Sequence, residues 1–140
     1  MVAEAAKPFV KELPAETQEI ILAACWCHDL IEDARETYND VKKVLGEPVA
    51  ELVYALTNEK GRTRAERANE KYYAGIRSTP YATLIKVCDR IANVRHSKAK
   101  GSRMFQVYGM EYVGFKRHLY QAGEWEDAWQ TLEQLLELAD

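Results

Sequence analysis

The chain has 140 residues, of which 47% are hydrophobic and 29% charged, and this composition predicts one globular domain spanning residues 1–140. Its net charge of −3 is too small to predict binding to nucleic acid or to an anionic membrane surface. No apolar run is long enough to span a membrane, and the first residues lack the apolar segment of a signal peptide. Because three cysteines are an odd number, we expect reduced thiols in a cytoplasmic protein.

The spacing of apolar and helix-breaking residues predicts an all-α bundle, since strand patterns are scarce and no repeat or linker is visible. In chain order, the expected helices are a segment that begins at Pro14, followed by 37–45, 48–57, 63–77, 80–97, 102–121 and 124–139. We expect Lys98 to Gly101 to form a basic loop between two of these helices.

Several expected helix ends have recognisable capping residues. Thr37 is a permitted N-cap, and Gly46 fits a left-handed C-terminal residue of the helix before it. Pro48 suits the first turn of the next helix. Thr63 and Glu66 have the spacing of a capping box, which predicts a helix start at that point.

A first polar cluster, His28-Asp29-Leu30-Ile31-Glu32-Asp33, directly follows the apolar run 20–27. Residues three and four apart share a helix face, so Asp29 lies beside Glu32 and Asp33. Burying unpaired charges in an apolar segment is costly. A divalent cation would remove this cost, because imidazole and carboxylate groups are ligands for Mn, Fe or Mg.

A second polar cluster lies on the expected helix 80–97. Lys86, Asp89, Asn93 and His96 follow steps of three, four and three, so they form one polar stripe. Apolar residues cover much of the remaining helix surface, which predicts that the helix is largely buried. The stripe must therefore face a cavity or a polar partner, and the first cluster is the simplest partner.

Together the clusters predict a hydrolytic metal site. In this interpretation His28, Asp29 and Asp89 bind the metal, and Glu32 and Asp33 orient and deprotonate the attacking water. Asn93, one turn after Asp89, would hydrogen-bond a ribose or a phosphate. The alternative is purely structural: a Lys86–Asp89 helical ion pair, Asn93 as a satisfied core amide, and Glu32 with Asp33 at a solvated helix end.

These residues resemble the HD-domain metal phosphohydrolases, which carry an H…HD…D ligand set. The H-D-x-x-E-D spacing is similar to the hydrolase domain of the Rel/Spo-type alarmone enzymes and their small relatives. The stretches Asp40 to Val53 and K-V-C-D-R-I-A-N-V-R, from Lys86 to Arg95, also resemble that family. The resemblance implies an all-α fold, Mn²⁺ as the usual metal (Mg²⁺ or Fe²⁺ as alternatives), and removal of pyrophosphate from the 3′ position of guanosine tetra- or pentaphosphate.

One family feature has no counterpart in this sequence. The family's first metal-binding histidine lies on a helix before the HD pair, whereas His28 is the earliest histidine here. Three explanations compete: the chain begins inside its domain and lacks that first helix, another subunit supplies the ligand, or the scaffold has lost catalysis. We expect the first of these, and a homo-oligomer is consistent with the second.

Further residues are candidates for the nucleotide site. Arg64 is the preferred phosphate contact in a basic group that also includes Arg62, Arg67 and Lys71, most of which we expect to be solvated. Tyr108 and Tyr112 are four apart, and the resemblance implies that a tyrosine near there contacts the nucleoside. His96 and His118 are expected at the surface, and Trp125 and Trp129 are expected to pack the last helix.

Three functions follow from these observations. The leading hypothesis is a metal-dependent hydrolase of (p)ppGpp-type nucleotides. The second keeps the site but changes the substrate to a deoxynucleotide or NADPH, since a related enzyme class removes the phosphate of NADPH. The third is a nucleotide-binding or regulatory module without turnover, which the missing histidine favours.

Overall fold

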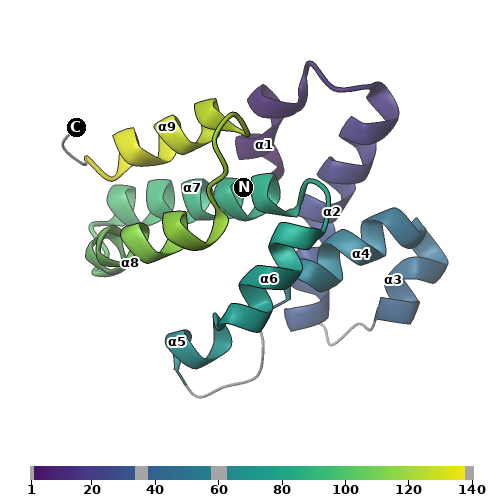
Figure 1. Cartoon of the computed structure of the whole chain (residues 1–140), viewed down its shortest axis with the longest axis horizontal. Coiled ribbons are helices and arrows are strands. Elements are labelled where there is room, and N and C mark those ends of the chain that lie inside the picture. Colours follow the sequence, from purple (N-terminus) through teal and green to yellow (C-terminus); the bar gives the residue numbers. More distant parts are fainter. Residues whose placement is uncertain (1, 34–37, 58–62, 138–140) are drawn as a thin grey trace.

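The computed structural model describes residues 2–33, 38–57 and 63–137, and within these ranges it leaves the side chains of residues 28–33 and of Ala65 undescribed. Every regular element in these ranges is a helix, which confirms the predicted all-α class (Figure 1). In chain order the helices are α1 (Val2–Val10), α2 (Ala15–Asp33), α3 (Tyr38–Leu45), α4 (Glu47–Leu56), α5 (Arg64–Arg67), α6 (Glu70–Ser78), α7 (Ala82–Lys100), α8 (Met104–Leu119) and α9 (Glu126–Leu135).

Helix α7 is the centre of the bundle. It contacts α1, α2, α4, α6, α8 and α9, and Figure 1 shows it running between α9 and α8. Its apolar side chains are fully buried, at 0% exposure for Leu84, Ile85, Val87, Cys88, Ile91 and Val94. Burying each large aliphatic side chain contributes about 1.5–3 kcal/mol. The predicted burial of this helix is therefore confirmed, and its polar residues must be accommodated inside the bundle.

Helix α1 is not among the helices that the sequence analysis predicts. The structure places Val2, Ala3, Ala6 and Val10 in the core, where α1 packs against α2 and α7. Pro8 lies within this short helix and is exposed. The small residues of α1 allow close packing on the central helix.

Three predicted boundaries differ from the structure. The expected helix 63–77 is two helices, because Asn69 caps α6 by accepting a hydrogen bond from the Tyr72 amide at 3.0 Å. Lys98 to Lys100 continue α7 instead of forming a loop, and Gly101 ends the helix at φ 64°. Gly46 has φ 91° and ψ 165°, so it is the N-cap of α4 and not a left-handed C-terminal residue.

Two other helix-start predictions are confirmed, whereas the predicted cap Thr37 lies outside the described residues. Thr63 Oγ1 accepts a hydrogen bond from the Glu66 amide at 3.1 Å, and this caps α5. Pro48 lies in the first turn of α4. Among the helices of the described ranges, none is long and apolar enough to cross a membrane.

Candidate functional site

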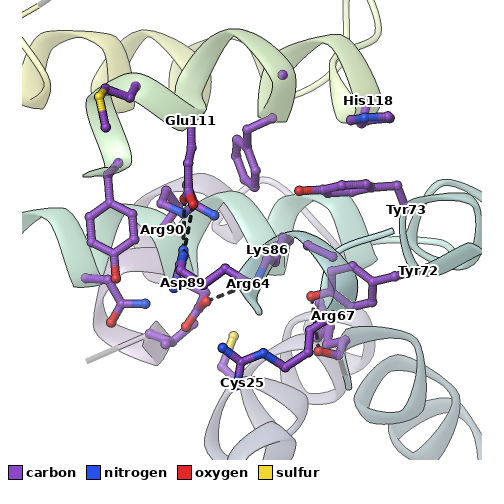
Figure 2. Close-up of a pocket in the computed structure, with 18 of the residues that line it drawn as sticks. Cys25, Arg64, Arg67, Tyr72, Tyr73, Lys86, Asp89, Arg90, Glu111 and His118 are labelled. Carbon is purple, nitrogen blue, oxygen red and sulfur yellow. Dashed lines mark hydrogen bonds and ion pairs between the residues drawn. The ribbon is translucent and has the colours of Figure 1, made fainter. Parts of the chain in front are cut away.

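A cavity of about 690 Å³ opens between α7, α8 and the helices that face them, α2, α5 and α6 (Figure 2). Five residues predicted for the nucleotide and metal site line it, namely Arg64, Lys86, Asp89, Asn93 and Tyr108. They come from three helices separated in the sequence, so the fold brings the predicted groups together. Tyr112 and His96 do not line the cavity.

The polar stripe of α7 forms one wall of the cavity. Lys86 Nζ lies 3.5 Å from Asp89 Oδ2, and these side chains are 15% and 20% exposed. Burial opposes the charge on Lys86, but Tyr72 and the Asp89 carboxylate outweigh it and hold the pKa of this amine above its usual value. Lys86 is therefore a cation within the cavity. Its Nζ also lies 5.6 Å from the centre of the Tyr72 ring.

The opposite wall is one face of α8. Tyr108, Glu111, Phe115 and His118 follow steps of three and four residues, and all of them line the cavity. Glu111 is the acceptor on this face, and Figure 2 shows it pointing from α8 toward the arginines. Arg64 donates two hydrogen bonds to its carboxylate, from Nε at 2.9 Å and from Nη2 at 2.8 Å. This paired geometry lowers the pKa of Glu111.

Arg90 is a cavity residue that the sequence analysis did not single out. It is 7% exposed, and its guanidinium lies 4.8 Å from the Tyr108 ring centre and 4.3 Å from that of Phe115. Its Nη1 is 3.3 Å from Glu111 Oε1. Burial lowers the pKa of Arg90, while the Glu111 charge counteracts this effect. The neighbouring Asp89 belongs to the predicted stripe, but nothing in the spacing indicated that Arg90 reaches the same cavity.

His118 was expected to be solvated, and its side chain is 36% exposed, but it also lines the cavity. Its ring stacks on Tyr73, with centroids 4.4 Å apart and planes at 5°. His118 Nδ1 lies 3.1 Å from Glu70 Oε2, and both rings of the stack line the cavity. The stack packs His118 closely enough for its ring to form part of the cavity wall.

The last turns of α2 connect the cavity to the first sequence motif. Cys25 lines the cavity and is 5% exposed, and burial with the nearby Asp89 charge raises the pKa of its thiol to about 12. The backbone of α2 continues in helical form to Asp33. The side chains of His28, Asp29, Glu32 and Asp33 lie outside the described part of the structure, so their predicted roles stay predictions.

Tyr112 does not line the cavity and packs toward α9. Its hydroxyl hydrogen-bonds Glu133, and its ring meets Trp129 at 6.3 Å between centroids. Of the two candidate tyrosines, Tyr108 lines the cavity and Tyr112 does not. Trp129 is 2% exposed, as expected for a packing residue, whereas Trp125 lies at the start of α9 with its ring 6.1 Å from that of Tyr81.

The described side chains by themselves provide no group of three or more His, Cys, Asp or Glu residues that could hold a metal ion. Asp89 is the predicted ligand that they do include, and it faces the cavity from α7. Its carboxylate is a hard oxygen donor of the kind that Mn²⁺ and Mg²⁺ accept. The donor chemistry of Asp89 therefore fits a divalent cation on the Asp89 side of the cavity.

Comparison with known proteins relates part of this chain to one group of hydrolases. A guanosine-3′,5′-bis(diphosphate) 3′-pyrophosphohydrolase named MESH1 from Drosophila melanogaster is 34% identical over 79 residues, covering 56% of this chain and 44% of the relative. MESH1 from Homo sapiens is 32% identical over 79 residues, with the same shares covered. A guanosine-3′,5′-bis(diphosphate) 3′-pyrophosphohydrolase from Aquifex aeolicus is 40% identical over 81 residues, covering 55% of this chain and 11% of the relative.

The predicted resemblance to this hydrolase group is confirmed. The match spans less than half the length of each of these relatives. No protein-family model matches the chain, and no solved structure matches it significantly. The likeness therefore rests on the similar sequences alone.

Proposed function

We propose that this chain carries the substrate cavity of a metal-dependent nucleotide phosphohydrolase that acts on guanosine 3′,5′-bis(diphosphate) or a close relative. The observation that supports the proposal is the cavity itself, which Asp89 and Asn93 line together with the cations Lys86 and Arg64. A nucleotide with several phosphates has the charge that these cations complement. The relatives named for this activity support the same substrate class.

In this proposal His28, Asp29 and Asp89 hold a divalent metal, with Mn²⁺ preferred over Mg²⁺ or Fe²⁺. Positions 28 and 29 follow Cys25 by three and four residues in α2, and Cys25 lines the cavity that Asp89 also lines. Residues at these spacings share a helix face, which supports the assignment. The bound metal would polarise a phosphoryl oxygen and favour deprotonation of water.

The remaining residues are proposed to bind the substrate or to accept the proton of the attacking water. Glu32 and Asp33, one turn after Asp29, are proposed to orient the attacking water and to accept its proton. Lys86 and Arg64 bind phosphate oxygens, and Asn93 donates a hydrogen bond to a ribose or phosphate oxygen. Tyr108, whose ring lies 5.6 Å from the Arg64 guanidinium, is proposed to contact the nucleoside. Tyr112 has no role in this proposal, because it faces α9.

The test combines metal content with hydrolysis. The full chain is supplied with Mn²⁺, its metal is measured by elemental analysis, and pyrophosphate release from guanosine tetraphosphate is followed. Asp89→Asn should lose the bound metal and about a thousandfold or more in kcat/KM. Asp127→Asn is the matched control, because Asp127 is exposed on α9. Equal activity of the two variants would contradict the proposal.

A nucleotide panel that includes NADPH and deoxynucleotides identifies the substrate. The competing hypothesis is a nucleotide-binding module without turnover. Stoichiometric nucleotide binding with no product release in excess Mn²⁺ would support that module and contradict hydrolysis.

A further inference from the structure

The short helix α5 places two arginines on the cavity, three residues apart. Arg64 and Arg67 both line it, and they share a face of the helix because of this spacing. Lys86 and Arg90 add two cations from α7. Among the described lining residues, these four cations face only the carboxylates of Asp89 and Glu111. Counted over the described lining residues, the cavity therefore has more cations than carboxylates, although the whole chain has a net charge of −3.

Arg67 has an unsatisfied donor at this position. Its Nε is buried and has no hydrogen-bond partner among the described residues. A buried donor without an acceptor is destabilising, so such groups are usually paired. Figure 2 shows the Arg67 side chain extending into the cavity, where an anionic ligand could supply an acceptor.

Arg64 is already occupied by an internal carboxylate. Its two hydrogen bonds to Glu111, at 2.8 and 2.9 Å, use the fork of guanidinium donors that also fits a phosphate. Glu111 also forms an ion pair with a second cation, because Arg90 Nη1 lies 3.3 Å from Glu111 Oε1. Arg64 is 47% exposed and Arg90 only 9%, counting side chains. A ligand can therefore reach Arg64 and release it while Glu111 stays paired with Arg90.

We propose that Arg64 and Arg67 form a subsite for a phosphate or diphosphate group, and that Glu111 competes with this group for Arg64. The subsite deepens the proposed function, on which it rests for the identity of the natural ligand. Arg67 supplies the donor that no described residue satisfies, and Arg64 exchanges a carboxylate for a phosphate. A ligand must therefore displace the Glu111 carboxylate from Arg64 in order to bind. A singly charged carboxylate binds Arg64 too weakly to do this, whereas a multiply charged phosphate binds strongly enough.

The subsite is tested without catalysis. Calorimetric titration of the full chain with inorganic pyrophosphate, in EDTA at pH 7, measures anion binding in the absence of metal. Arg67→Gln should weaken binding about tenfold, because it removes a charge-assisted donor pair. Arg67→Lys keeps the charge but loses the fork, so it should weaken binding by less. Arg117→Gln is the control: this exposed α8 residue does not line the cavity, and its loss should change affinity less than about twofold.

Glu111→Gln tests the competition. Binding of pyrophosphate should tighten by about threefold or more, because the ligand no longer displaces an ionised carboxylate. Acetate, a singly charged carboxylate, should bind the unchanged chain far more weakly than pyrophosphate. Circular dichroism confirms that each variant is folded before its affinity is compared.

The results separate this proposal from the function proposed above. Equal affinity of Arg67→Gln and Arg117→Gln, weaker binding by folded Glu111→Gln, or no binding of pyrophosphate by the unchanged chain would each overturn the subsite. Absence of guanosine tetraphosphate hydrolysis would contradict the proposed activity alone, because the titration needs neither metal nor turnover.

Discussion

Helix α8 has two faces that contain the same kinds of side chain but arrange them differently. One face lines the cavity, and the other packs against α9 through Tyr112, Lys116 and Leu119. On the α9 side, the Glu133 carboxylate accepts hydrogen bonds from Tyr112 and, at 2.8 Å, from Lys116. On the cavity side, Glu111 is shared between two arginines while Arg67 Nε has no described partner. Polar pairs thus join α8 to α9, where the buried Trp129 Nε1 also has no hydrogen-bond partner among the described residues, and what distinguishes the cavity side is its larger number of cations.

The packing between α8 and α9 is aromatic at its centre. The Trp129 ring meets the rings of Tyr112, Phe115 and Tyr120 at centroid distances of 6.3, 5.6 and 5.8 Å. Edge and tilted contacts of this kind add to the stabilisation from burial. The α9 side of α8 is therefore built for stability, whereas the cavity side exposes charge that only a ligand would complement. This difference can be tested by separating effects on unfolding from effects on turnover.

The largest expected effect is on the α9 side. Trp129→Ala should reduce the free energy of unfolding by about 3–5 kcal/mol, because it leaves a large cavity between α8, α9 and the core. Trp26→Ala is the control, since Trp26 is 68% exposed. It should change stability by less than about 0.5 kcal/mol. Urea unfolding followed by circular dichroism measures both. Similar losses in the two variants would show that Trp129 is not the packing centre.

The two tyrosines of α8 should separate stability from binding. Tyr112→Phe removes the hydroxyl that hydrogen-bonds Glu133 and should cost about 1 kcal/mol of unfolding free energy. It should leave the KM for the nucleotide unchanged. Tyr108→Leu removes the ring that lies against Arg64 and Arg90, so KM should rise severalfold. A raised KM in Tyr112→Phe would place both faces of α8 in substrate binding.

The helical class and the burial of α7 could be predicted because they depend on local periodicity. Asp89 and Asn93 follow a spacing of four, and their place on one polar stripe follows from helix geometry alone. The Thr63 cap is also a local interaction, and the sequence predicted it correctly. Helix periodicity was therefore predictable, whereas several helix ends were not: the sequence analysis misassigned the ends near Gly46, Asn69 and Gly101.

The residues that sequence reasoning missed depend on how helices meet. Glu111 and Tyr112 are adjacent, and no local pattern indicates which of them faces α7 and which faces α9. Arg90 is buried because two rings of α8 enclose its guanidinium, and α8 begins fourteen residues later in the chain. His118 enters the cavity wall through a stack with Tyr73 of α6. Such contacts arise from tertiary packing, which the spacing of residues in one helix does not determine.

The smallest expected effect is the pH dependence of the contact between α8 and α9. The Lys116 ammonium and the Tyr112 hydroxyl lower the pKa of Glu133 below its ordinary value of 4.5. A carboxyl whose folded-state pKa is depressed stabilises the protein above its unfolded pKa and loses this contribution as the pH falls through the folded value. Because the Glu133 side chain is 35% exposed, solvent screening keeps the contribution below about 1 kcal/mol.

Thermal unfolding of the unchanged chain and of Glu133→Gln, compared at pH 6 and pH 3, measures this contribution directly. The unchanged chain should be the more stable at pH 6, and the difference should shrink toward zero at pH 3. At pH 3 the unfolded chains carry little charge at position 133, whether it is Glu or Gln. Any difference in stability that remains at pH 3 therefore reports how far the pKa of Glu133 is lowered in the folded protein. A difference that grows on acidification would mean that Glu133 is not held as a carboxylate by Lys116, and the polar pairing on this side of α8 would then be wrong.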